Sequence, residues 1–183
     1  EVDYDLMDRI LDPLIAQSDV QIVSMHWGVE YQNQPNDMQK AVAQYLHDKG
    51  VEAVIGSHPH VIQPAEIIKS ADQETLVYYS LGNFISGQDQ NYTMVGGMAQ
   101  FTMNYNFDAK KATITDPSFT PTVTWISSDL RRYNTQLLQD YTDDEAASQY
   151  VTLVQGQDWS RGYVKEYVEQ VMGQPEGIRI VTE

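Results

Sequence analysis

The sequence predicts a mixed α/β fold in which parallel strands come first and antiparallel strands follow. Two short apolar runs, residues 20–25 and 53–55, have the composition of buried strands. Residues 37–50 lie between them and carry apolar side chains at helical spacing. A strand, a helix and a strand in this order almost always form a right-handed parallel crossover. From residue 98 onward apolar and polar residues alternate, which is typical of antiparallel strands.

Local signals mark the ends of the first two helices. Residues 3–17 have apolar side chains at helical spacing, and Pro13 predicts a kink or a break in this surface helix. In the helix at residues 37–50, Asn36 is suited to cap the N-terminus and Gly50 to end the last turn.

The later elements follow from strand-forming residues and helix caps. Residues 75–81 are rich in strand formers and run directly into Gly82-Asn83-Phe84. Further expected elements are strands at 98–106, 112–115 and 122–127 and helices at 142–155 and 160–172.

Length and composition limit the kinds of partner and metal site. At 183 residues the chain suits one domain, and a fold of this size buries on the order of 70% of its extended surface. Its 26 acidic and 11 basic residues give a formal charge of −15, which argues against nucleic acid as a partner. Without cysteine, a metal site would have to use nitrogen and oxygen ligands. No apolar run approaches the roughly 20 residues needed to cross a bilayer.

Three of the four histidines lie directly after predicted strands. His26 follows the first apolar run, and the segment Gly56-Ser57-His58-Pro59-His60 follows the second. Parallel strands end along one edge of a sheet, where ligands bind in open α/β folds, so the two clusters should meet. Because a residue before proline favours an extended conformation, we expect His58 to be extended and both imidazoles to face one side. Such a pair can supply two nitrogen ligands to a transition metal.

Several of these residues also have a purely structural interpretation. His58 and His60 could be exposed histidines of a turn, and Asn83 an ordinary turn asparagine. Trp27 and Tyr31 could line a substrate cleft, but buried aromatic residues are more common.

Other polar residues near the clusters leave similar alternatives. Glu30 lies four residues beyond His26 and could orient a ligand or act as an acid or base, with a surface ion pair as the alternative. Gln63 and Glu66 could contact substrate or simply continue a strand. His47 is expected to be a surface histidine among polar neighbours of its helix.

Three blocks of residues together resemble one protein family. In order they are His26-Trp27-Gly28-x-Glu30-Tyr31, Gly56-x-His58-Pro59-His60-Val61-x-Gln63-Pro64-x-Glu66 and Tyr79-Ser80-Leu81-Gly82-Asn83-Phe84-Ile85. The chain resembles the bacterial CapA family of capsule and poly-γ-glutamate biosynthesis proteins over roughly residues 1–130. Residues 131–183 would then form a helical extension packed on that domain.

The resemblance implies a fold, a cofactor and a set of site residues. The CapA family is similar to the calcineurin-like metallophosphoesterases, which implies an α+β sandwich of two sheets flanked by helices. It also implies two divalent ions, manganese, iron or zinc, in the full-length protein. His26, His58 and His60 would be metal ligands, and His26 and Glu30 would act in catalysis. The expected substrate contacts are Tyr31, Gln63, Glu66 and Asn83.

The family's opening blocks, a Gly-Asp block, an Asn-Leu-Glu-like block and an Asn-Asn-His block, are not found in this sequence. We therefore expect the C-terminal half of a longer protein, with part of a two-metal site and little activity alone.

Two functions remain for the full-length protein. One is a metal-dependent hydrolase of a phosphoester or related bond. The other is a non-catalytic component of a capsule or poly-γ-glutamate assembly complex, which binds the polymer or a membrane synthase. The resemblance implies an extracytoplasmic protein that is membrane-anchored through a segment outside this chain. Both phosphoesters and polyglutamate are anions, so local attraction would have to come from bound metal, from backbone amides or from the missing half of the protein.

Overall fold

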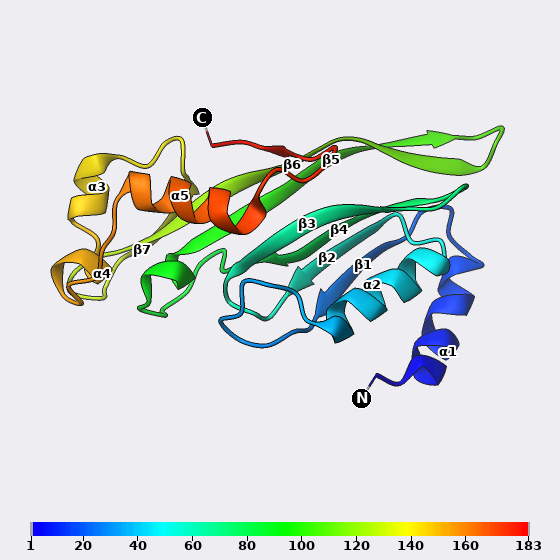
Figure 1. Ribbon diagram of the computed structural model, residues 1–183, viewed down its shortest axis with the longest axis horizontal. Coiled ribbons are helices and arrows are strands. Elements are labelled where there is room, and N and C mark those ends of the chain that lie inside the picture. The colour runs from blue at the N-terminus through cyan, green and yellow to red at the C-terminus, as the bar shows by residue number, and fades with distance from the viewer. Residues whose placement is uncertain (1, 183) are drawn as a thin grey trace.

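A computed structural model describes residues 2–182 and places them in two β-sheets flanked by helices (Figure 1). The chain runs through α1 (Tyr4–Ile15), β1 (Ile22–His26), α2 (Asp37–Asp48), β2 (Ala53–Ser57), β3 (Ile62–Lys69), β4 (Glu74–Leu81), the 3-10 helix η1 (Asn91–Met94), β5 (Val95–Asn106), β6 (Lys111–Ile126), β7 (Tyr133–Leu137), α3 (Asp143–Ala147), α4 (Tyr150–Leu153), α5 (Arg161–Met172) and β8 (Arg179–Ile180). The predicted fold class, an α+β sandwich, is confirmed. No helix in the described part of the chain has both the length and the apolar character to span a membrane.

The first sheet has the strand order β1-β2-β4-β3. β1 pairs with β2 and β2 with β4 in parallel, whereas β3 runs antiparallel to β4. The predicted parallel crossover is therefore confirmed, with α2 as its helix. Asn36 caps α2 as expected, and the side chain of Gln39 completes a capping box. Val42 and Leu46 of α2 share a buried cluster with Val54 of β2, which fixes the helix on this face of the sheet.

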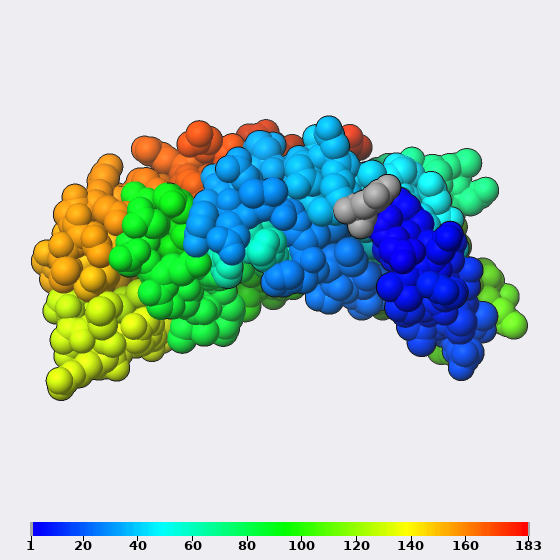
Figure 2. Space-filling view, turned by 90° about the horizontal axis from the view of Figure 1, so that it is seen from below, coloured from blue at the N-terminus to red at the C-terminus, as the bar shows by residue number. Residues whose placement is uncertain are grey.

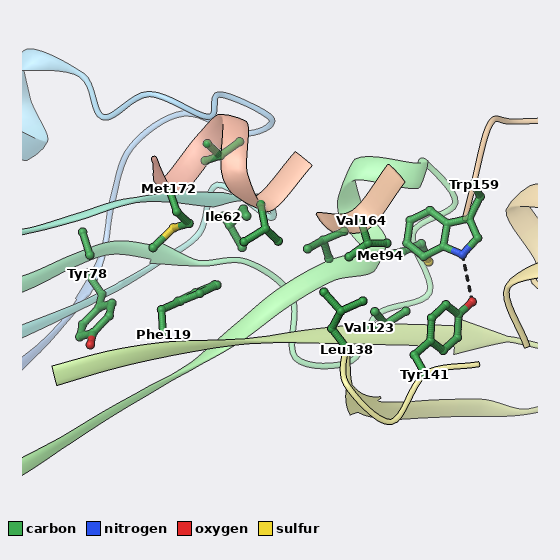
Figure 3. Close-up of a cluster of buried hydrophobic side chains, with 14 of the residues drawn as sticks. Ile62, Tyr78, Met94, Phe119, Val123, Leu138, Tyr141, Trp159, Val164 and Met172 are labelled. Atoms are coloured by element: carbon green, nitrogen blue, oxygen red, sulfur yellow. Dashed lines mark hydrogen bonds between the residues drawn. The ribbon is translucent and has the colours of Figure 1, made fainter. Parts of the chain in front are cut away.

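The second sheet joins β5, β6 and β7 in antiparallel pairs and adds β8 parallel to β6. It meets the first sheet and α5 around the larger buried cluster (Figure 3). Ile62 and Tyr78 from the first sheet lie in this cluster with Phe119 of β6 and Met172 of α5. The Tyr78 hydroxyl also donates to the Ser118 carbonyl oxygen at 2.8 Å, which links the two sheets directly.

Residues 131–183 contribute the strands β7 and β8 as well as α3, α4 and α5. Trp159 and Val164 belong to the same buried cluster as Ile62 and Phe119. The division at residue 130 stays a prediction, and the two parts share this core.

The single helix expected at residues 142–155 is wrong, because the structure divides it into α3 and α4. Gln149 lies at the division and is fully buried. Its Oε1 accepts from the Ile126 N–H at 2.6 Å, and its Nε2 donates to the Thr124 carbonyl oxygen at 2.7 Å. The side chain thus satisfies backbone groups of β6, and this tertiary contact overrides local helix propensity.

The expectation of a surface His47 is also wrong. Its side chain is buried, and its Nδ1 lies 3.0 Å from the Thr75 hydroxyl oxygen. Since Thr75 donates its own proton to the Val51 carbonyl oxygen at 2.6 Å, its oxygen is the acceptor for His47. The polar neighbours of His47 in sequence gave no sign of this partner from β4.

Two smaller expectations change as well. α1 continues past Pro13 to Ile15, so the chain does not break at the proline. The strands expected at 112–115 and 122–127 are parts of β6, and Asp116, with a φ of 53°, lies between them.

Replacing Gln149 by leucine should lower the free energy of unfolding by about 3 kcal/mol, because two buried backbone groups of β6 lose their partners. Urea unfolding followed by tryptophan fluorescence measures the change. Gln170→Leu, at an exposed position of α5, is the matched control and should leave the midpoint nearly unchanged. Equal midpoints for the two variants would contradict the role of Gln149.

Candidate metal site at the strand ends

The carboxyl ends of β1, β2 and β4 bring the three sequence blocks to one edge of the first sheet. His26 and His58 have ring centroids 4.5 Å apart, and those of His58 and His60 are 6.0 Å apart. His60 Nδ1 lies 2.9 Å from Asn83 Oδ1. The prediction that both histidine clusters and Asn83 meet at this edge is therefore confirmed.

Trp27 holds the three strand ends together. Its buried indole crosses β2 at Gly56, and Nε1 donates to the Tyr79 carbonyl oxygen of β4 at 2.8 Å. A Cβ at Gly56 would lie 1.9 Å from that oxygen and 2.6 Å from the indole nitrogen. Only glycine fits at this crossing. Of the two interpretations of Trp27, the structure supports the buried aromatic residue.

Glu30, His58 and His60 form the one group of three potential metal ligands that converges among residues 2–182. Their ligand atoms all lie within 4.8 Å of one another. Glu30 is exposed and the two histidines are half-buried, so the group opens to solvent. The sequence predicted His26 as the third ligand; its exposed ring lies against His58, outside the group of three. The structure therefore gives Glu30 a position suited to binding a metal.

The extended conformation expected for His58 is wrong. His58 has a φ of 100°, and His60 and Tyr31 have φ values of 60° and 62°. Positive φ is uncommon outside glycine and costs of order 1–3 kcal/mol per residue, so it persists only where surrounding contacts impose it. One such contact is the Tyr31 N–H, which donates to the Pro59 carbonyl oxygen at 2.8 Å. This bond joins the two loops and competes with the local preference for an extended residue before proline.

Asn83 fixes the tautomer of the His60 ring. Its Nδ2 donates to the Thr93 carbonyl oxygen at 3.1 Å and to Gln88 Oε1 at 2.9 Å, which orients its Oδ1 as an acceptor. His60 Nδ1 must then carry the hydrogen of the 2.9 Å bond. This leaves Nε2 as the nitrogen with a free lone pair, the tautomer that a metal-ligating histidine needs.

Tyr31 lies exposed at the rim of the group. Its hydroxyl accepts from Gln88 Nε2 at 3.1 Å, and its ring centroid lies 6.1 Å from that of His60. Partial desolvation, followed by the negative charge of Glu30, raises the pKa of the Tyr31 hydroxyl. The phenol is therefore neutral at physiological pH and can act as a hydrogen-bond donor.

The other two predicted substrate contacts are engaged elsewhere. Gln63 is buried: its Oε1 accepts from Gln39 Nε2 at 2.7 Å, and its Nε2 donates to the Gln32 carbonyl oxygen at 2.8 Å. Glu66 accepts from the Tyr79 hydroxyl at 2.6 Å. The amide of Gln63 supports the loop that carries Glu30 and Tyr31, while Glu66 continues β3.

Comparisons with known proteins found related sequences. Residues 5–88 match the family described as "Bacterial capsule synthesis protein PGA_cap". The chain is 36% identical over 102 residues to "PGA biosynthesis protein CapA" of Bacillus subtilis (strain 168), covering 54% of this chain and 26% of that protein. It is 33% identical over 100 residues to "Capsule biosynthesis protein CapA" of Bacillus anthracis, covering 55% of this chain and 23% of that protein. The chain is therefore similar to part of these capsule biosynthesis proteins.

The matches cover about a quarter of the length of these curated CapA relatives. The family match also ends short of α5, because it stops at residue 88 and α5 comprises residues 161–172. The matched region holds all the strand ends that form the candidate site.

Sequence reasoning missed several contacts that support the site. Gln39 stands three residues after Asn36, a capping-box pattern visible in the sequence, but its contact with Gln63 depends on β3. Gly28, with a φ of 89°, brings its backbone so close that a Cβ there would lie 2.8 Å from Gln39 Oε1. The contact of Gln88 with Tyr31 has no local signal, because the two residues are 57 positions apart in sequence.

Replacing Gly56 by alanine should destabilise the protein by about 3 kcal/mol, since the new methyl group would overlap the Tyr79 carbonyl and the Trp27 indole. Thermal unfolding by circular dichroism measures the loss. Gly162→Ala, in α5, is the matched control, because its Cβ would meet the Ser160 hydroxyl at an ordinary 3.5 Å. If both variants unfold at the wild-type temperature, the close crossing at Gly56 is wrong.

Proposed function

We propose that this chain forms part of a divalent-metal site in a capsule biosynthesis protein and that the full-length protein uses the site as a metal-dependent hydrolase. One observation carries the proposal: the ligand atoms of Glu30, His58 and His60 converge within 4.8 Å of one another. The left-handed backbone of both histidines supports it, because strain of this kind gathers at functional sites.

The donor set fits such an ion. Two imidazoles and one carboxylate suit manganese, iron or zinc, and sites with three protein ligands keep positions open for substrate. His60 offers Nε2 because its Nδ1 is held by Asn83. A divalent ion would supply Lewis acidity toward a phosphoryl or carboxyl oxygen. A second ion would need ligands beyond the three, and His26, whose ring lies beside that of His58, is a candidate.

The remaining side chains suggest a division of roles. Asn83 would orient His60, and Glu30 would bind metal instead of acting as an acid or base. Tyr31 would donate from its neutral hydroxyl to a substrate oxygen, since it lies exposed beside His60. The formal charge of −15 attracts cations to the protein and disfavours anionic substrates until a metal is bound.

The biological part of the proposal rests on the printed names of the relatives, a PGA biosynthesis protein and a capsule biosynthesis protein. We assign this chain to the same process, with poly-γ-glutamate, capsule polymer or a phosphoester as substrate and a membrane synthase complex as partner. An extracytoplasmic location, with membrane attachment through sequence outside these residues, is part of the same proposal.

A non-catalytic polymer-binding role is the second candidate. The small donor set favours it, because one group of three ligands converges in the described residues, fewer than a two-ion centre requires. Bound metal without hydrolysis in the full-length protein would select this alternative.

Metal binding is expected to depend on the three convergent residues. Isothermal titration with manganese chloride or zinc chloride should show at least a hundredfold weaker binding in His60→Ala and Glu30→Gln than in the wild type. Asn83→Ala should weaken binding by about 10–100-fold, because His60 loses the partner that sets its tautomer.

Asn134→Ala, at an exposed position of β7, is the matched control and should bind metal as the wild type does. His26→Ala separates the two ligand sets, since a smaller effect than that of Glu30→Gln favours the group of three. Unchanged affinity in both His60→Ala and Glu30→Gln would overturn the metal site.

Hydrolysis is expected in the full-length protein. Manganese-dependent turnover of p-nitrophenyl phosphate should fall about a hundredfold or more in His60→Ala and persist in Asn134→Ala. A chelator should abolish the wild-type activity, and added manganese should restore it. Equal turnover in wild type and His60→Ala would contradict catalysis at this site.

A further inference from the structure

Two loops carry the candidate metal site. The first site loop, residues 27–36, joins β1 to α2 and carries Glu30 and Tyr31. The second site loop, residues 82–94, follows β4 and carries Asn83. Figure 2 shows the second site loop (green) between the first site loop (blue) and the orange residues around α4. Hydrogen bonds join residues from this later part of the chain to both site loops.

The first contact joins α5 to the first site loop. Asn33 Nδ2 donates to the Tyr167 hydroxyl oxygen at 2.6 Å, across 134 residues of sequence. The same nitrogen donates to the Ile62 carbonyl oxygen at 3.0 Å, so both of its hydrogens are used. Asn33 is three residues beyond Glu30, and its restraint limits where the Glu30 carboxylate can move.

The second set of contacts joins the residues before α5 to the second site loop. Gln157 Oε1 accepts from the Asn91 N–H at 2.8 Å, and its Nε2 donates to the Asp89 carbonyl oxygen at 2.9 Å. Gln155 Nε2 donates to Asp89 Oδ2 at 2.9 Å, and Asn91 Nδ2 donates to the Asp158 carbonyl oxygen at 3.1 Å. The restrained loop includes Gln88 and Thr93, which orient Asn83.

The segment that makes these contacts is itself anchored in the core. Val164 and Val168 of α5 are fully buried, and the Trp159 indole donates to the Tyr141 hydroxyl oxygen at 2.9 Å (Figure 3). A hydrogen bond from a rigid helix can therefore fix a loop position.

We infer that residues 155–167 act as a clamp that positions both site loops for metal binding, with Tyr167 as a positioning residue. This inference rests on the proposed metal site. The clamp lies outside residues 5–88, the part of the chain that matches the capsule synthesis family. Because binding equilibria are reciprocal, a clamp that favours metal is also strengthened by metal.

The test removes one hydroxyl. Tyr167→Phe leaves Val164 and Val168 in place and should weaken manganese binding about tenfold in titrations with manganese chloride alone. Tyr163→Phe is the matched control: it lies one turn earlier in α5, and no hydrogen bond to its hydroxyl is found among residues 2–182. It should bind manganese as the wild type does.

The effect of manganese on hydrogen exchange of the α5 amides is a second measurement. Loss of a Tyr167 hydroxyl that only stabilised the fold would not change this effect. Manganese should slow exchange in α5 of the wild type and of Tyr163→Phe, and should have little effect on α5 of Tyr167→Phe. Equal metal-dependent protection in all three proteins would overturn the clamp.

Manganese binding by the wild type separates failure of the proposed metal site from failure of the clamp. If the wild-type chain binds no manganese, the proposed metal site is wrong. The clamp is then tested by measuring amide exchange at residues 29–34 without metal. Faster exchange in Tyr167→Phe than in Tyr163→Phe then supports a clamp on the loop. Equal exchange in the two variants overturns it.

Discussion

The hydrogen bond from the Trp27 indole to the Tyr79 carbonyl oxygen is the interaction on which the site depends. It spans β2 and fixes the carboxyl ends of β1 and β4 on either side of Gly56, where no side chain fits between them. His26 precedes the tryptophan and His58 follows the glycine closely, so the same bond sets the distance between the two histidine clusters. Strand pairing alone would align these ends without fixing the loops that leave them.

Neutral amides carry the next layer of support. Gln39, Gln63 and Asn33 hold the first site loop through buried or half-buried hydrogen bonds, and Asn83 and Gln88 connect the second loop to His60 and Tyr31. An amide can donate and accept at once without placing a charge beside the proposed metal ligands. This arrangement leaves the carboxylate of Glu30 as the charged group among the three convergent residues, which suits a site that gathers a cation.

The parts of this structure that were predictable have local or periodic signals. The Asn36 cap follows from a capping residue before a helical pattern. The parallel crossover and the meeting of the histidine clusters with Asn83 follow from the predicted strand ends. The conformation of His58 was not predictable, since the Tyr31–Pro59 hydrogen bond between two loops overrides a rule for neighbouring residues. The predictions of a surface His47 and of a single helix through Gln149 were wrong for the same reason. The partners of these two residues, Thr75, Thr124 and Ile126, are distant in sequence.

The same separation in sequence would couple folding to metal binding at the proposed site. Glu30 lies beside the histidines on a loop that is held by β3 through Gln63 and by α5 through Asn33. An unfolded chain has the three ligands far apart, so the ion would bind the folded state and stabilise it. Because Tyr167 contacts the first site loop from outside the family-matched residues, the proposed clamp would let sequence changes in α5 alter metal affinity without changing a proposed ligand.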